Sequence, residues 1–152
     1  MKLQRYTHSS SGFTLMELLV VISIAMILMG IAVPSFLSWL PTLRLSSAAR
    51  QVATDLQLAR MKAISQNTSF QVSFASTTYV LQKCSPSCAS PTNDTGNIVL
   101  PAGITVSAST TPQFLPRGTA NASATITVSN GGAQKLVCVK TVGRVNIKDS
   151  SC

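Results

Sequence analysis

The chain has 152 residues, which is enough for one domain, and only 11% of them are charged. The formal net charge of +8, from 12 Lys and Arg against 4 Asp and Glu, indicates an anionic partner or a membrane-orientation signal. The acids are few and scattered, and His8 is the single histidine, so a Ser or Cys nucleophile has no base beyond the first residues. We therefore expect no enzymatic activity and no cofactor.

The first apolar segment follows a short basic leader, residues 1–12. Phe13–Val33 is apolar throughout except for isolated polar residues. At a rise of about 1.5 Å per residue it is long enough to cross a hydrocarbon core of about 30 Å, so we expect residues 13–34 to span a membrane. A secretory signal peptide is the alternative, but its apolar run is usually about 7–15 residues and its small-residue cleavage site follows that run. In this chain the small residue Gly12 precedes the apolar run, which argues against a secretory signal peptide.

Residues 35–66 have a helical pattern with one apolar face. Apolar residues recur every three or four positions, namely at Leu45, Ala49, Val52, Leu56, Ala59 and Ala63. We expect this segment to continue the membrane helix and to pack one face on a folded domain. Pro34 and Pro41 each remove a backbone donor and are expected to bend or loosen the helix. Asn67 is the expected stop.

Residues 67–152 have the alternation and turn signals of a β-rich head domain. The expected strands include Phe70, Val72 and Phe74, then Tyr79 and Leu81, then Ile98–Val106 with an interruption at Pro101 and Gly103, then Phe114–Thr119 as a short strand with a turn, and finally Val142–Lys148. Thr125–Ser129 and Lys135–Lys140 flank Asn130-Gly131-Gly132 and predict a hairpin. The fold class is therefore α+β, with a long N-terminal helix packed on an antiparallel sheet.

Four cysteines, Cys84, Cys88, Cys138 and Cys152, all follow the apolar segment, on the side expected to lie outside the cytoplasm. Three pairings are possible. Cys84 with Cys88 would close a small loop, and Cys138 with Cys152 would tie the tail to the last hairpin. Zinc is the alternative, but the sequence has no Cys-x-x-Cys pair and no histidine near these cysteines, so we expect disulfides and no metal.

The residues Gly12-Phe13-Thr14-Leu15-Met16-Glu17, followed by the apolar run, resemble the signal of type IV prepilins and type II secretion pseudopilins. The resemblance implies that a membrane prepilin peptidase cuts between Gly12 and Phe13 and methylates the new N-terminus of Phe13.

Glu17 supports the same interpretation on physical grounds. A carboxylate within an apolar span costs about 2.5–3.5 kcal/mol and therefore needs a partner. No Lys or Arg occurs from Phe13 to Trp39. The resemblance implies that Glu17 pairs with the Phe13 amine of a neighbouring subunit during assembly. The alternative is a single polar residue tolerated near the membrane surface.

The C-terminal half is similar to the GspH/FimT branch of minor pilins and pseudopilins. The residues that carry this similarity are Phe114-Leu115-Pro116-Arg117-Gly118-Thr119, Val137-Cys138-Val139 and Gly143-Arg144-Val145. Some FimT-like proteins bind DNA through Gly-Arg-x-Arg, but this chain has Asn146 at the second arginine. On an extended strand, Lys140, Val142, Arg144, Asn146 and Lys148 would share one face that contacts phosphates, joined by Arg117. A solvated strand face is the alternative.

These features predict a minor pilin or pseudopilin whose helix is held in the bacterial inner membrane and whose head lies in the periplasm. Its expected partners are the prepilin peptidase, other pilin subunits, the inner membrane and, through the basic residues, DNA. The favoured machine is a FimT-like type IV pilus. The alternatives are a GspH-type pseudopilin of the type II secretion system, a DNA receptor on the pilus, and a plain membrane anchor that forms no filament.

Overall fold

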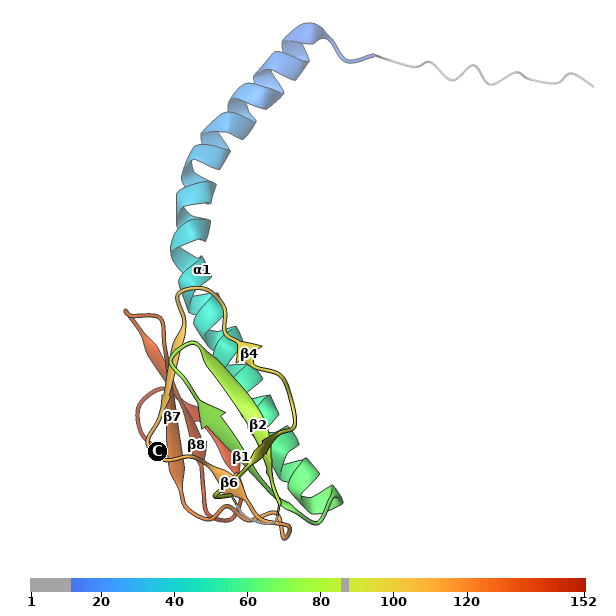
Figure 1. The fold of residues 1–152 in the computed structure, drawn as a ribbon. Coiled ribbons are helices and arrows are strands. Elements are labelled where there is room, and N and C mark those ends of the chain that lie inside the picture. The colour runs from blue at the N-terminus through green and yellow to red at the C-terminus, as the bar shows by residue number, and fades with distance from the viewer. Residues whose placement is uncertain (1–11, 86–87) are drawn as a thin grey trace, which may run out of the picture. The chain divides into compact units, whose positions relative to one another are not determined.

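The structure is a computed structural model that describes residues 12–85 and 88–152. Within these residues, one long helix, α1, precedes the strands β1 to β9 (Figure 1). The chain forms two compact units, Met1–Trp39 and Leu40–Cys152. The described part of the first unit is the beginning of α1, and the second unit, which we call the head, contains the rest of α1 and the strands.

Helix α1 runs from Leu15 to Ser65 without interruption. Pro34 and Pro41, which we expected to bend or loosen the helix, do not end it, since helical structure continues through both positions. Each proline removes one backbone donor, and the hydrogen bonds of the neighbouring turns can hold the helix. Between the prolines, the Ser38 hydroxyl donates to the Ser35 carbonyl oxygen at 2.8 Å, which gives that carbonyl an additional partner.

Helix α1 ends at Ser65, and its C-terminal turn is closed at Asn67, the predicted stop. This residue has a φ of 49°, in the left-handed region that Asn adopts more readily than most residues. The Thr68 N–H donates to the Ala63 carbonyl at 3.2 Å, and the Asn67 N–H donates to the Ile64 carbonyl at 3.4 Å. This pair of bonds is the Schellman arrangement that satisfies the last carbonyls of a helix.

Two antiparallel sheets follow. The first is built on the hairpin of β1 (Ser69–Phe74) and β2 (Thr78–Cys84), with the order β3-β2-β1-β6 and with β4 also pairing with β2. The short members are β3 (Thr92–Asn93), β4 (Ile98–Val99) and β6 (Gln113–Phe114). The second sheet has the order β5-β7-β8-β9, made by β5 (Thr105–Ala108), β7 (Ala124–Ser129), β8 (Gln134–Val139) and β9 (Val145–Lys148).

The expected strands are wrong in extent at Ile98–Val106, at Phe114–Thr119, where β6 is only Gln113–Phe114, and at Val142–Lys148, where β9 begins at Val145. The segment Ile98–Val106 does not form one interrupted strand, because its start is β4 in the first sheet and its end belongs to β5 in the second. The break is a turn between them, in which Gly103 has a φ of 81° and the Ile104 N–H donates to the Pro101 carbonyl at 3.1 Å. The chain therefore changes sheets at Pro101 and Gly103.

The predicted hairpin around Asn130-Gly131-Gly132 is confirmed, with Ser129 opposite Gln134 and Ala124 opposite Val139. The side-chain oxygen Oδ1 of Asn130 accepts from the N–H groups of Gly132 and Ala133, at 3.1 and 2.7 Å. Asn130 Nδ2 also reaches the Pro41 carbonyl of α1 at 3.4 Å.

The core lies between the head part of α1 and the two sheets. The buried face of α1 consists of small and branched residues, Leu45, Ala48, Ala49, Val52, Ala53, Leu56, Ala59 and Ala63, including all six predicted positions. Alanine dominates this face, so the helix backbone can come close to the strands. Strand residues such as Phe70, Leu81 and Ile126 complete the core.

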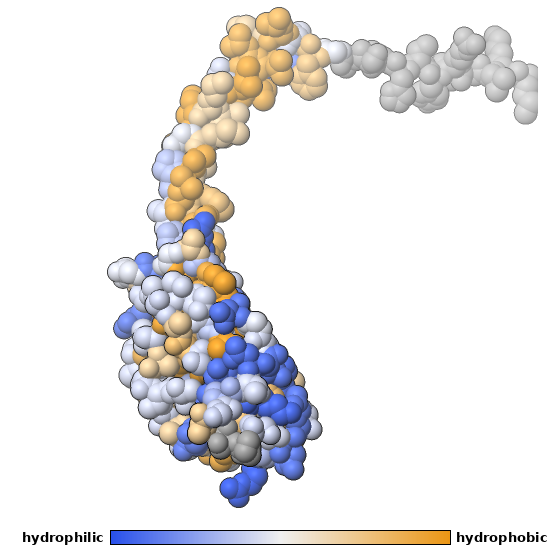
Figure 2. All heavy atoms as spheres, viewed as in Figure 1, coloured by the Kyte–Doolittle hydropathy of each residue, from blue (hydrophilic) through white to orange (hydrophobic). Residues whose placement is uncertain are grey.

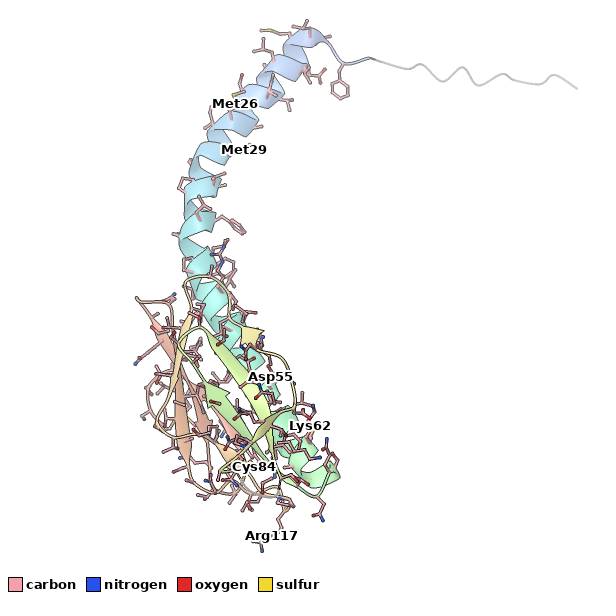
Figure 3. All side chains as sticks on the ribbon, viewed as in Figure 1. Met26, Met29, Asp55, Lys62, Cys84 and Arg117 are labelled. Atoms are coloured by element: carbon pink, nitrogen blue, oxygen red, sulfur yellow. A yellow bond between two sulfur atoms is a disulfide. The ribbon has the colours of Figure 1, made fainter. Side chains whose placement is uncertain are left out.

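Two polar contacts join the outer flank of α1 to the first sheet. The buried Tyr79 hydroxyl donates to the Asp55 carboxylate, and Lys62 forms an ion pair with Asp94, beyond β3 (Figure 3 labels Asp55 and Lys62). Burial and the neighbouring Asp55 carboxylate together raise the pKa of Tyr79 well above its usual value, so the hydroxyl stays protonated.

Both pairs of cysteines that we considered as bridges are disulfides. Cys84 at the end of β2 is bonded to Cys88, with 4.5 Å between their Cα atoms. Cys138 in β8 is bonded to Cys152, with 5.6 Å between their Cα atoms. The second bridge holds the tail beyond β9 against the second sheet.

Candidate assembly segment and basic turns

The first part of α1 exposes an apolar surface on all sides. None of its most apolar stretch is buried, and the helix is long and apolar enough to cross a membrane. Figure 2 shows apolar side chains covering this part of the chain, whereas the head surface is mostly polar. A surface of this kind is stable in lipid or against other apolar helices.

One polar side chain in this segment is satisfied by the helix itself. The Ser23 hydroxyl donates to the Leu19 carbonyl oxygen at 2.8 Å, the usual way in which a serine is accommodated in an apolar helix. The segment can therefore enter an apolar environment without an unpaired hydroxyl at Ser23.

Glu17 lies in the first turn of α1 and is part of its N-terminal cap. The Glu17 N–H donates to the Thr14 hydroxyl oxygen at 3.2 Å, so Thr14 is the N-cap and Glu17 occupies the third helical position. Thr14-Leu15-Met16-Glu17 has the Thr-x-x-Glu spacing of a capping box, a signal that the sequence interpretation missed. A carboxylate here is also favoured by the positive end of the helix dipole.

Glu17 is exposed, and neither of the ion pairs found among the described residues includes it. Its carboxylate belongs to the first turn of α1, and Phe13, four residues earlier, is 81% accessible. Gly12 and Phe13 precede the helix in irregular backbone, and nothing lies within 4 Å of where a Gly12 Cβ would be. The rest of the expected leader lies outside the described residues.

The two C-terminal motifs form the same kind of turn. In Leu115–Thr119 the Gly118 N–H donates to the Leu115 carbonyl and the Leu115 N–H to the Thr119 carbonyl, both at 2.8 Å. In Lys140–Arg144 the Gly143 N–H donates to the Lys140 carbonyl at 2.8 Å and the Lys140 N–H to the Arg144 carbonyl at 2.9 Å. Each is a three-residue hairpin loop closed by a glycine with a φ of 80°. Gly118 and Gly143 are thus turn residues.

The two turns also touch each other and helix α1. A Cβ on Gly143 would lie 2.0 Å from the Gly118 carbonyl oxygen and 2.8 Å from Nε of Arg60. Arg60 Nε donates to that same carbonyl oxygen at 2.7 Å. Arg60, which sequence reasoning missed, therefore joins the helix to both motifs, and the absence of side chains at both glycines allows the close approach.

The expected basic stripe is wrong in its geometry. Lys140 to Gly143 form a turn instead of an extended strand, so Lys140 and Val142 do not share the face of β9 with Asn146 and Lys148. Lys140 Nζ instead donates to the carbonyl oxygen of Cys152 at 2.7 Å. Arg117, Arg144 and Lys148 are exposed. Arg117 directly precedes Gly118 and Arg144 directly follows Gly143, and these two turn glycines approach each other (Figure 3 labels Arg117).

Across residues 12–85 and 88–152, no group of three or more His, Cys, Asp or Glu side chains is arranged to hold a metal ion. The arrangement therefore offers an apolar helix with one capped carboxylate, and a head with two basic turns.

Comparison with known proteins agrees with this arrangement. Residues 48–143 match the family model of type II transport protein GspH, a region that includes Arg60, Gly118 and Gly143. Residues 7–33 match the model of the prokaryotic N-terminal methylation motif. Comparison with curated proteins gives no match.

Solved structures share the fold. The type IV minor pilin FimU of Pseudomonas aeruginosa is 22% identical, with a TM-score of 0.56 over 71% of this chain and 90% of that one. The minor pseudopilin EpsH of the type 2 secretion system of Vibrio cholerae is 12% identical, with a TM-score of 0.59 over 72% of this chain and 99% of that one. The GspH model covers more than half of the chain, so this chain belongs to the GspH family and carries a prokaryotic N-terminal methylation motif.

Proposed function

We propose that this chain is a minor pilin or pseudopilin, a structural subunit that enters a filament through α1. The observation that carries the proposal is the unburied apolar surface of the first part of α1, most of which lies within the matched methylation motif, residues 7–33. Before assembly the inner membrane would cover this surface, and in the filament the helices of neighbouring subunits would cover it. The head would lie in the periplasm, where its two disulfides are stable.

Processing would take place between Gly12 and Phe13. This bond precedes the helix in exposed irregular backbone, which supports access for a prepilin peptidase. Cleavage would leave the Phe13 amine one residue before the Thr14 cap, and methylation would keep that amine basic. Glu17 would then pair with the Phe13 amine of a neighbouring subunit, since its own helix segment offers no Lys or Arg.

The test is the intact mass and N-terminal sequence of the protein from its native membrane, beside a Gly12→Ala variant. We expect a chain that starts at methylated Phe13, and we expect the variant to keep its leader. Glu17→Gln should be processed normally but should be lost from sheared filaments, because the neutral amide cannot pair with the amine. A native chain that retains Met1, or one cut beyond Val33, would contradict the proposal.

The favoured machine is a type IV pilus, and a type II secretion system is the alternative. The two solved structures described above come from one system of each kind, so the fold supports both. Secretion of a folded substrate in a deletion strain, set against twitching and pilus number in the same strain, separates the two machines.

Contact with DNA phosphates is a second candidate function, favoured by the exposed Arg117 and Arg144 beside two touching turns. It predicts that DNA binding by the full chain in detergent weakens as salt increases, and that Arg144→Gln lowers affinity with a shallower salt dependence. Lys83→Gln, far from these turns in sequence, is the control. Equal binding by both variants would rule out this candidate.

A further inference from the structure

Strand β9 is an edge strand with backbone groups that face outward. It is the last member of the second sheet and pairs on one side with β8. The bond from the Lys140 N–H to the Arg144 carbonyl sets the alternation of that ladder. Counting along the register, Asn146 and Lys148 direct their N–H and C=O groups toward β8, whereas Val145 and Ile147 direct theirs away from it.

A groove lies between this edge and the side of α1 that carries Arg50 and Thr54. It consists of two hollows of about 210 and about 440 Å³ that share Arg50 and Ile147. Ser46 and Lys135 complete the smaller hollow, and Thr54, Gln57 and Val145 are among the residues that line the larger. The floor is partly apolar, since Ile147 is 39% exposed and Val145 is half-buried.

The groove is cationic. Arg50 and Lys135 line it, and no Asp or Glu lines either hollow. Lys135 is paired with Asp149, but neither ion pair among the described residues includes Arg50. The head as a whole has ten Lys and Arg against three Asp. This balance favours an acidic occupant.

The charges on β9 disfavour pairing with a second copy of the same strand. In an antiparallel pair of two β9 strands, Arg144 and Lys148 of one copy would lie near Lys148 and Arg144 of the other, and like charges opposite each other destabilise a sheet. An acidic strand would face the same cations favourably. The exposed edge therefore selects between occupants by charge.

We propose that β9 accepts an extended acidic segment of a partner polypeptide as an additional strand. The backbone of that segment would bond to the outward groups of Val145 and Ile147, and its inward side chains would cover Ile147 and reach Arg50. Main-chain bonds would supply affinity, and Arg50 would supply selectivity. This binding site is on the head and does not depend on how α1 assembles.

The test measures binding of a fluorescein-labelled hexapeptide of alternating Val and Glu to the full chain in detergent micelles, by fluorescence anisotropy. A Val and Lys hexapeptide is the charge control. A Val and Glu hexapeptide N-methylated at alternate backbone positions is the control for strand addition. We expect only the unmodified acidic peptide to bind, and Arg50→Glu to weaken it about tenfold.

Two matched variants isolate the backbone bond. Ile147→Ala and Ile147→Pro both remove the side chain, but only the second removes the outward N–H, and it leaves the bonds to β8 in place. We expect Ile147→Pro to bind about tenfold more weakly than Ile147→Ala. Amide exchange of Val145 and Ile147 should slow when the peptide binds. If Ile147→Pro does not fold, Arg50→Glu and the N-methylated peptide still decide the question.

Three results would overturn the proposal. The first is no binding by the acidic peptide, and the second is equal binding by the N-methylated peptide or by Arg50→Glu, which would indicate nonspecific adsorption. The third is a concentration-dependent dimer that Ile147→Pro abolishes, which would assign the edge to a second copy of this chain.

Discussion

Gly118 and Gly143 have two separate reasons to be glycine. Both have a φ of 80°, which a side chain disfavours, and both are buried where two turns meet Arg60. Arg60 donates to the Gly118 carbonyl oxygen, and the absence of a side chain at Gly143 leaves space for the arginine. The two C-terminal motifs that carry the family resemblance therefore contain the packing contact of Gly118 and Gly143 with Arg60 as well as exposed arginines.

Three glycine-to-alanine changes separate backbone strain from close approach. Gly143→Ala combines a positive φ with a Cβ 2.0 Å from the Gly118 carbonyl oxygen, and we expect it to lower the free energy of unfolding by more than about 2 kcal/mol. Gly131→Ala has a φ of 85° and open space, and we expect a loss of about 1 kcal/mol. Gly132→Ala, whose Cβ would approach only Asn130 at 3.9 Å, should change stability by less than about 0.5 kcal/mol.

Urea unfolding of the full chain in detergent, followed by far-UV circular dichroism, measures this series. Equal losses for Gly143→Ala and Gly131→Ala would show that strain alone matters and that the contact with Gly118 and Arg60 contributes nothing.

At the scale of elements, α1 has two environments along one uninterrupted helix. Its first part exposes apolar residues, whereas its part within the head buries an alanine-rich face against the strands. The flank of this second part is fixed by polar bonds, among which Tyr79 to Asp55 joins α1 directly to β2. Removing the bond between Tyr79 and Asp55 would measure how much it contributes to holding the helix on the first sheet.

Tyr79→Phe should change both stability and its dependence on pH. Because burial and Asp55 raise the pKa of Tyr79 above the ordinary value of about 10, the folded chain holds the phenolic proton more tightly than the unfolded chain. This stabilisation is complete below about pH 10 and is lost as the pH increases further. The variant should be about 1 kcal/mol less stable at pH 7, since one hydrogen bond is removed.

Urea unfolding at pH 7 and pH 11 measures this prediction. The difference between the two chains should shrink at the higher pH, because the unfolded chain with Tyr79 loses the phenolic proton there while the folded chain keeps it, and the variant has no phenol at this position. Tyr79 is the single tyrosine of the described residues, so Tyr6 of the leader is the one other phenol to remove as a control. An unchanged difference would contradict the prediction.

Local patterns in the sequence predicted the elements well and their connections less well. The apolar face of α1, the stop at Asn67 and the hairpin at Asn130 follow from spacing and turn chemistry, which act over a few residues. The division of Ile98–Val106 between two sheets depends on distant partner strands, which spacing does not contain. Of the candidate site, the place of Glu17 near the start of the apolar helix was predictable, but the contact of Arg60 with Gly118 joins residues 58 apart.

The position of Gly143 in the sequence is a local signal for the Lys140–Arg144 turn, where we predicted an extended strand. Gly143 lies four positions after Val139, the last residue of β8, as is typical of a three-residue hairpin loop, and Gly118 repeats this spacing after Phe114, the last residue of β6. The motif was interpreted as an extended strand because alternating cations resemble one. In the structure the turn separates Lys140 and Val142 from β9, so the basic residues do not form one continuous face.

At the scale of the whole molecule, the head is held together by contacts between distant parts of the chain. The two sheets are joined where the Val106 N–H donates to the Ser76 carbonyl at 2.9 Å. The Cys138–Cys152 bridge and the bond from Lys140 to Cys152 attach the tail to the second sheet. Each of these contacts needs the C-terminal third of the chain.

This connectivity sets an order of events during synthesis. The first part of α1 leaves the ribosome early, but the core against the alanine face of α1 includes residues of β7 and β8, and the bond between Asn130 and Pro41 closes a separation of 89 residues. Nonlocal pairing of this kind is slow. The head therefore completes its fold late, and the apolar face of α1 stays partly exposed until the C-terminal strands have been made.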